Sequence, residues 1–230
     1  ALPYILSKLD VPVYASRLTH GLITVKLREH GLLTDSRLNV IEPHAPFKIG
    51  GFRVEFFRVC HSIPDAMGIA ITTPEGLVVH TGDFKIDHTP VDGKSIDFSS
   101  LAQLCAPGVL LMCSDSTYAE VEGYTPSERV VGEALDRVIG DADGRVMVAT
   151  FASLISRAQQ VIDSAVKHGR KVTVVGRSMV NNVKMGINMG YLQVPSGTIV
   201  PLGQAKQLPR KEIVILATGA QGEPTSALVR

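Results

Sequence analysis

Residues 59–87 read VCHSIPDAMGIAITTPEGLVVHTGDFKID, and the first part of the chain is organised around this stretch. It holds two apolar, β-rich runs, 67–73 and 77–81, which are separated by a Pro-Glu-Gly sequence. That pattern predicts a β-hairpin with a tight turn. Because a hairpin carries the chain out and back, we expect His61 and Asp83 to lie at one edge of the same sheet. An imidazole and a carboxylate brought together in this way form a candidate metal site.

The segments on either side of this stretch predict more strands than helices. Before it, strands are predicted at 11–15, 39–42, 47–49 and 52–59, and a helix with one apolar side is predicted at 17–30. After it come a polar loop at 85–99, a short helix at 99–105 and a buried strand at 109–113. In 52–59 apolar residues occupy both alternating sets of positions, which predicts a strand buried at least partly on both faces.

Several polar residues near the candidate metal pair favour a structural interpretation. Cys60 stands next to His61 and is a candidate ligand, but a free cysteine more often fills a core. The alternation along 77–81 predicts that His80 faces away from the turn that follows it, so we interpret His80 as structural. Asp65 and Asp87 are interpreted as turn or helix N-cap residues.

The pattern changes near residue 125, where strands begin to alternate with helices. Strands are predicted at 145–150, 171–175 and 213–217, and helices at 126–139, 153–168, 178–189 and from near Glu223. Thr125, Pro126 and Glu128 fit the N-cap, first and capping-box positions of the first of these helices. Because alternating strands and helices predict a parallel sheet, we expect an α/β protein with domains at 1–125 and 126–230.

Three strands of the second domain end in small, polar or glycine-rich sequences. Strand 145–150 runs into Phe151-Ala152-Ser153, strand 171–175 into Gly176-Arg177-Ser178, and strand 213–217 into Thr218-Gly219-Ala220-Gln221-Gly222. Ligands of open α/β sheets bind where the strands end. Backbone N–H groups, hydroxyls and the Arg177 guanidinium are donors suited to phosphate oxygens. The alternative is that the glycines and serines serve packing and capping only.

Composition and charge restrict the class of protein further. The chain is 45% hydrophobic, which is enough to fill a core, and no apolar run reaches the roughly 20 residues that span a bilayer. The three cysteines lie in or beside apolar segments, which is typical of buried thiols in a reducing compartment such as the cytoplasm. Acidic side chains outnumber basic ones in 1–127, and the reverse holds in 128–230. A basic second half suits an anionic polymer.

Six motifs, in order, resemble the ribonuclease J family of metallo-β-lactamase-fold nucleases. They are CHSIPDA, HTGDFK, SDSTYAE, ATFAS, VVGRSM and ATGAQGEP, and the likeness covers essentially the whole chain. The resemblance implies an αββα sandwich at 1–125 and an inserted β-CASP α/β domain at 126–230, each in part. It also implies cleavage of RNA, endonucleolytic and 5′-to-3′ exonucleolytic, with two zinc ions in the active site. A cytoplasmic homo-oligomer that binds RNA and no membrane is the implied form.

The resemblance also assigns roles to individual residues. His61 matches a metal-ligand histidine, and Asp83 matches the carboxylate that bridges the two zinc ions. Asp115 matches an acidic residue beside the metal ligands. The loop with Ala152, Ser153 and Leu154 matches one that holds a nucleotide phosphate, and we group Arg177 and Ser178 with it. This chain has Tyr118, Leu154 and Ala220 where the family pattern has Asn, Asn and Ser. Leu154 puts one amide contact to the substrate in doubt, and Ala220 removes one hydroxyl.

The main metal motif of the family, His-x-His-x-Asp-His, does not occur in this sequence. In relatives it precedes a run that ends in Ala-Leu-Pro-Tyr, and this chain opens with Ala1-Leu2-Pro3-Tyr4. We therefore expect an internal fragment that is inactive by itself, because catalytic zinc takes about three protein ligands. Two alternatives remain open. One is a metallo-β-lactamase-fold hydrolase of a small thioester or lactone, and the other is a non-catalytic RNA-binding relative.

Overall fold

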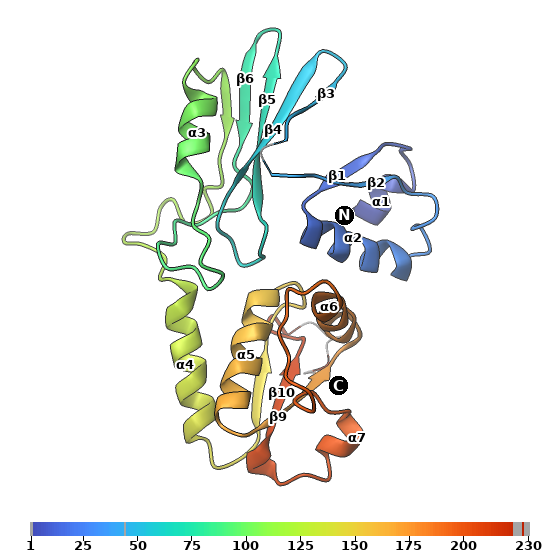
Figure 1. Ribbon diagram of the computed structural model, residues 1–230, viewed down its shortest axis with the longest axis vertical. Helices are drawn as coiled ribbons and strands as arrows, with labels where there is room; N and C mark the ends of the chain where they lie inside the picture. Colours follow the sequence, from blue (N-terminus) through green and yellow to red (C-terminus); the bar gives the residue numbers. More distant parts are fainter. Residues whose placement is uncertain (1, 44, 223–226, 228–230) are drawn as a thin grey trace. The chain divides into compact units, whose positions relative to one another are not determined.

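The computed structural model describes residues 2–43, 45–222 and 227, so the helix predicted near Glu223 lies outside the described residues. The chain divides into two compact units, Ala1–Glu128 and Arg129–Arg230. Each combines helices with a β-sheet, as Figure 1 shows, and the prediction of an α/β protein is confirmed.

The main sheet of the first unit has five strands. Their order is β3 (Phe47–Ile49), β4 (Phe52–Arg58), β5 (Met67–Thr73), β6 (Gly76–His80) and β7 (Leu111–Cys113). Strands β3 to β6 are antiparallel to their neighbours, and β7 is parallel to β6. The hairpin prediction is confirmed, because β5 pairs with β6 from Thr73 opposite Gly76 to Ile69 opposite His80. The start of β5 and the end of β6 therefore share one edge of the sheet.

Strand β4 contributes to a core on each face of this sheet. Phe57, together with Val59 just after the strand, belongs to one buried cluster, which the side chains of α3 (Phe98–Cys105) cover. Val54 and Phe56 belong to a second cluster, which packs with Ile41. The prediction that this strand is buried on both faces is confirmed, because its alternate residues point to opposite sides.

Strand β7 was expected to be buried, and that prediction is wrong. All three of its residues are exposed, with Leu111 at 53% and Met112 at 56%. β7 stands at the end of the five-stranded order and pairs with β6. Hydrophobic content alone therefore misled the prediction, because burial also requires an element that covers the strand. The same holds for the thiols, since Cys60 is buried but Cys113 is exposed.

A smaller group of elements precedes the main sheet. It comprises α1 (Leu2–Leu6), β1 (Val13–Ala15), α2 (Arg17–Glu29) and β2 (Leu38–Val40), and β1 pairs with β2 in parallel. Leu18 and Leu27 are fully buried on one side of α2. The predicted amphipathic helix is confirmed, with its end one residue earlier than expected.

The second unit contains a parallel sheet, as predicted. Its order is β8 (Val146–Ala149), β10 (Ile213–Ala217) and β9 (Lys171–Val175), and both pairings are parallel. The other elements are α4 (Glu128–Asp141), α5 (Ile155–Lys167), α6 (Arg177–Asn188), α7 (Leu202–Ala205) and a 3-10 turn, Arg210–Glu212. The central strand β10 is almost wholly buried, and α5 buries an apolar side rich in Ile, Val and Ala.

Helix α4 begins two residues later than the sequence predicts. Its first residue is Glu128, so Pro126 is not at the first helical position. The backbone N–H of Glu128 donates to a carboxylate oxygen of Asp87 at 3.1 Å. An acceptor from the loop after β6 thus caps the helix, and a prediction from local capping patterns could not include it.

Gly68 provides a direct test of packing in the first unit. A Cβ atom built on Gly68 would lie 2.2 Å from the Phe57 ring. Because Phe57 is almost fully buried, we expect Gly68→Ala to lower the free energy of unfolding by about 1–3 kcal/mol. Urea unfolding of the 230-residue chain measures the change. Gly51→Ala is the matched control, since a Cβ there meets nothing within 4 Å, and equal losses in both variants would contradict this packing.

Candidate active-site residues

The two predicted metal ligands lie on segments that are joined by a backbone hydrogen bond. The Lys85 N–H, two residues after Asp83, donates to the carbonyl of Cys60, the residue before His61, at 2.8 Å. His61 is half-buried and Asp83 is exposed. Between β6 and Asp83, Gly82 has a φ of +64°, a backbone conformation that favours glycine. The turn that carries Asp83 therefore depends on this glycine.

Asp115 lies beside both of these segments. One of its carboxylate oxygens accepts the Phe84 N–H at 3.3 Å, and the other accepts the Thr117 hydroxyl at 2.6 Å and the Thr117 N–H at 2.9 Å. These bonds from Thr117 and Phe84 hold the pKa of Asp115 below its ordinary value, and the charge of nearby His61 adds to the effect. Asp115 is thus an oriented, ionised carboxylate close to His61.

The backbone of Asp115 is also fixed. Its N–H donates to the hydroxyl of Thr81 at 3.0 Å, and the Thr81 N–H donates to the carbonyl of Cys113. Thr81 is buried. Sequence reasoning did not single out Thr81, although a hydroxyl at the end of an apolar strand and just before the Gly-Asp turn was an available signal.

The described residues do not complete a metal site. Among them, no group of three or more His, Cys, Asp or Glu side chains is arranged to hold a metal ion. Catalytic zinc takes about three protein ligands. His61 and Asp83 offer suitable donor atoms but not a sufficient set, so no reaction step through a metal can be derived from these residues.

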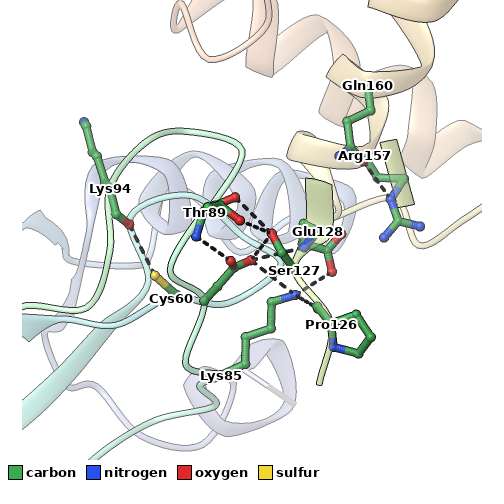
Figure 2. Close-up of polar contacts among 10 residues, drawn as sticks. Cys60, Lys85, Thr89, Lys94, Pro126, Ser127, Glu128, Arg157 and Gln160 are labelled. Atoms are coloured by element: carbon green, nitrogen blue, oxygen red, sulfur yellow. Dashed lines mark hydrogen bonds and ion pairs between the residues drawn. The ribbon is translucent and has the colours of Figure 1, made fainter. Parts of the chain in front are cut away.

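Two neighbouring residues have structural contacts. The Cys60 thiol donates to the carbonyl of Lys94 at 3.3 Å (Figure 2), and burial raises the pKa of that thiol, with Asp92 and Asp87 adding to the rise. A protonated, buried thiol matches the interpretation of Cys60 as a core residue. His80 differs from expectation, because its Nδ1 accepts the Gly82 N–H at 2.9 Å and so contacts the turn before Asp83.

A polar cluster around Asp87 holds the end of the Asp83 loop. The Asp87 carboxylate accepts hydrogen bonds from the Thr89 N–H, the Ser127 hydroxyl and the Glu128 N–H. The Lys85 ammonium lies 3.7 Å from this carboxylate and 3.1 Å from that of Glu128. Figure 2 shows the polar contacts that join Lys85, Thr89, Ser127 and Glu128 in this cluster. The prediction that Asp87 is a turn or N-cap residue is confirmed for the turn, because the carboxylate accepts the N–H of Thr89 two positions on. Asp87 is not the N-cap residue of a helix that follows it, but it accepts the first N–H of α4, which is distant in sequence.

This cluster predicts a dependence of stability on pH. Burial acts to raise the pKa of Asp87, but the hydrogen bonds from Thr89, Ser127 and Glu128 and the charge of Lys85 outweigh it, so the pKa is lowered. A lowered pKa stabilises the fold fully above the ordinary value of about 3.9, and the contribution is lost as the pH falls through the lower value in the folded protein. Near neutral pH we expect Asp87→Asn to cost about 1–2 kcal/mol in the free energy of unfolding.

Chemical denaturation of both chains between about pH 3 and 7 checks this expectation. The difference between wild type and Asp87→Asn should be constant above about pH 5 and should shrink in acid. Asp10→Asn is the control, because the Asp10 side chain is 83% exposed in its ion pair with Arg37. Asp10→Asn should change the free energy of unfolding by no more than about 0.5 kcal/mol. A difference for Asp87→Asn that does not change with pH would contradict the charged cap.

In the second unit, the three predicted phosphate loops lie at one edge of the sheet. Ala217 at the end of β10 is level with Ala149 of β8 and Val175 of β9. The following residues of each strand therefore emerge side by side. Gly176 has a φ of +102°, and a Cβ there would lie 2.6 Å from the Thr218 hydroxyl, so the loops after β9 and β10 are in close contact.

Two helices begin at the same edge. Helix α5 starts after Leu154 and α6 starts after Gly176, and neither of these N-cap residues supplies a side-chain cap. Arg177 and Ser178 are exposed at the start of α6. Helix N-termini present N–H groups and a partial positive charge, to which the Arg177 guanidinium adds a full one. This edge has the chemistry of an anion-binding surface.

The loop with Ala152 and Ser153 is tied to helix α6 by a residue that sequence reasoning missed. The side-chain amide of Asn182 donates to the carbonyl of Ala152 at 3.0 Å. Asn182 is buried within the apolar side of α6, together with Met179, Val183 and Gly186. A polar residue inside an apolar helical stripe was the available signal, because buried amides require hydrogen-bond partners.

Comparison with known proteins identifies close relatives. Residues 143–230 match the sequence model of the ribonuclease J β-CASP domain. Curated proteins named ribonuclease J align over the whole chain, with 46% identity in Synechocystis sp. and 49% in Thermus thermophilus. A protein named ribonuclease J 1 from Streptococcus pyogenes is 43% identical. The chain spans 36%, 40% and 41% of these three relatives.

A solved structure shares the fold at low sequence identity. It is a protein of unknown function from Enterococcus faecalis, which matches with a TM-score of 0.66 and 15% identity over 90% of this chain and 53% of that one. This likeness concerns the fold alone. In the part of the chain that the structure describes, none of the helices is long and apolar enough to cross a membrane.

Proposed function

We propose that this chain is part of a metal-dependent ribonuclease of the ribonuclease J family. The observation that carries the proposal is the identity of 46–49% to two proteins named ribonuclease J, which extends over both units. The geometry supports it, because an oriented carboxylate group lies in one unit and an anion-binding edge in the other.

The proposed roles of the residues in the first unit follow the family pattern. We infer that 1–125 is part of a metallo-β-lactamase domain and that His61 and Asp83 are ligands of a site with two zinc ions. Asp115, held by Thr117 and Phe84, would keep its carboxylate ionised beside His61. Because the described residues offer too few ligands, the remaining ligands are proposed to come from other parts of the whole protein. The inactivity of the 230-residue chain alone stays a prediction.

In the second unit, the carboxyl edge of the parallel sheet is the proposed site for a phosphate of RNA. Ala152, Ser153 and Leu154 precede α5, and Arg177 and Ser178 open α6. We infer that the hydroxyls of Ser153 and Ser178 and the Arg177 guanidinium would contact the phosphate, while the N–H of Leu154 already donates to the carbonyl of Phe151. The excess of basic residues in 128–230 would strengthen the attraction to the RNA backbone. The cytoplasmic location and the homo-oligomer also stay proposals.

One comparison of substrates separates this function from the two alternatives. The complete protein encoded by the gene is incubated with a 5′-monophosphorylated RNA and, separately, with a small thioester or lactone, and products and RNA binding are both measured. We expect cleavage of the RNA and no turnover of the small substrates. Binding of RNA without cleavage would favour the non-catalytic relative, and turnover of the small substrate alone would favour the small-molecule hydrolase.

A further inference from the structure

Each of the two predicted ligands is followed, four positions later, by an aspartate that does not belong to the predicted ligand set. His61 is followed by Asp65 and Asp83 by Asp87. The structure shows that both of these aspartates bond to the start of a helix from a remote part of the chain. The proposed function assigns no role to either of these two aspartates.

Asp65 connects the His61 loop to helix α2. One carboxylate oxygen of Asp65 accepts the backbone N–H of Leu18, in the first turn of α2, at 3.0 Å. Asp65 also has a φ of +63°, a left-handed conformation that is uncommon for residues other than glycine. Such a backbone conformation persists only where the surroundings enforce it. Leu18 is fully buried, so the helix to which Asp65 is bonded is anchored in the core.

Asp87 connects the Asp83 loop to the start of α4 in the same way. Its buried carboxylate accepts the Glu128 N–H, and Glu128 is the last residue of the first unit. Lys85, midway between Asp83 and Asp87, adds ion pairs to Asp87 and Glu128 and donates to the carbonyl of Pro126. The chain after Asp83 is thus held at two points within four residues.

We propose that Asp65 and Asp87 are positioning residues, which fix the His61 and Asp83 loops by bonding them to helix N-termini. Each ligand lies between a sheet edge on one side and an anchored aspartate on the other, so little backbone freedom remains for it. The Lys85–Cys60 backbone hydrogen bond then links the two fixed loops. The inference rests on the proposed function for the meaning of His61 and Asp83, but the anchoring itself does not.

A matched control is present in the same unit. Asp97 caps helix α3 by accepting the Ser100 N–H at 2.9 Å, which is also a bond from a carboxylate to a helix N-terminus. Neither predicted ligand lies within ten positions of Asp97 in the sequence. If Asp65 and Asp87 were ordinary caps, replacing any of the three aspartates would have similar consequences. Positioning predicts that only Asp65 and Asp87 affect the ligand loops.

The first readout is amide hydrogen exchange in the 230-residue chain, which requires no activity. We expect Asp65→Ala to speed exchange roughly tenfold at Val59, whose N–H donates to the carbonyl of Ala66 across the His61 loop. Asp87→Ala should speed exchange by a similar factor at Phe84 and Lys85, whose N–H groups are hydrogen bonded in the Asp83 loop. Asp65→Asn and Asp87→Asn retain an oxygen acceptor and should restore part of the protection. Asp97→Ala should change neither loop. Unchanged exchange in both loops, in variants that remain folded, would overturn the proposal.

The second readout is RNA cleavage by the complete protein. Asp65→Ala and Asp87→Ala should each lower kcat about 10–100-fold with little change in KM, as expected when supporting residues of a catalytic group are lost. Asp97→Ala should keep its kcat. A loss of kcat in all three variants alike would overturn positioning and leave the ribonuclease proposal intact. If the complete wild-type protein cleaves no RNA, the proposed function is overturned. The hydrogen-exchange experiment then tests by itself whether Asp65 and Asp87 fix the two loops.

Discussion

Replacing Asp83 by Asn in the complete protein should reduce the rate of RNA cleavage more than 100-fold. Losing a group that only supports a metal ligand costs about 10–100-fold, and losing a ligand should cost more. Asn retains the size of the side chain but not its negative charge, so it cannot neutralise the two zinc ions that we propose Asp83 to bridge. Because Asp83 is exposed and its loop is held through Lys85 and Asp87, the variant should fold normally. Single-turnover cleavage of a 5′-labelled RNA measures the effect.

The matched control for this experiment is Glu75→Gln. Glu75 is exposed in the turn of the β5–β6 hairpin, at the end opposite Asp83, and the change removes one carboxylate charge from the same hairpin. Its cleavage rate should equal that of the wild type. An Asp83→Asn protein that cleaves within tenfold of the wild-type rate would exclude Asp83 as a bridging ligand.

Replacing Arg177 by Ala should weaken RNA binding by roughly tenfold, as expected for loss of a charged hydrogen bond to phosphate. It should also reduce the slope of log affinity against log salt concentration by about 0.7, the contribution of one phosphate contact in single-stranded RNA. Arg177 is exposed at the first position of α6, beside the loops that follow β8 and β10. Binding is measured with the complete protein in the presence of chelator, so that RNA remains intact.

Arg210→Ala is the control for this second experiment. Arg210 is exposed just before β10, at the end of the parallel sheet opposite Arg177. Its removal changes the net charge equally but leaves the proposed phosphate edge intact. The two variants should differ in affinity and in salt slope. Equal effects would mean that RNA responds to the overall charge of this unit and not to the carboxyl edge of the sheet.

Much of the fold could be predicted because it depends on short-range patterns. The two β-rich runs around a Pro-Glu-Gly turn determined the β5–β6 hairpin and its common edge. The alternation in β4 indicated two buried faces, since Phe56 and Phe57 point into different clusters. The parallel sheet of the second unit followed from strands alternating with helices.

The features that could not be predicted depend on partners distant in sequence. The run that forms β7 is as apolar as a buried strand, yet its residues are exposed. The start of α4 depends on Asp87, which lies forty-one positions before Glu128. Local propensity predicts neither the exposure of β7 nor the capping of α4. Both depend on which other elements lie beside these residues in the folded chain.

The residues of the candidate site also divide into those that the sequence predicts and those that it does not. His61, Asp83 and Asp115 could be named from the sequence through the family resemblance, and the structure brings their segments together through Lys85, Cys60 and Phe84. Their supports could be named only in part. The sequence predicts Asp65 and Asp87 as turn or N-cap residues but not the remote helices to which they bond. Asn182 and Thr81 were missed, because each acts through a backbone group that is distant in sequence.

We expect the complete protein to be a ribonuclease that requires metal. The most direct measurement is the rate at which the purified complete protein degrades a 5′-monophosphorylated RNA, before chelation, after chelation and after zinc is added back. Loss of cleavage on chelation and its return with zinc is the predicted result. Cleavage that continues unchanged in the metal-free protein, or RNA that stays intact under all three conditions, would contradict the claim.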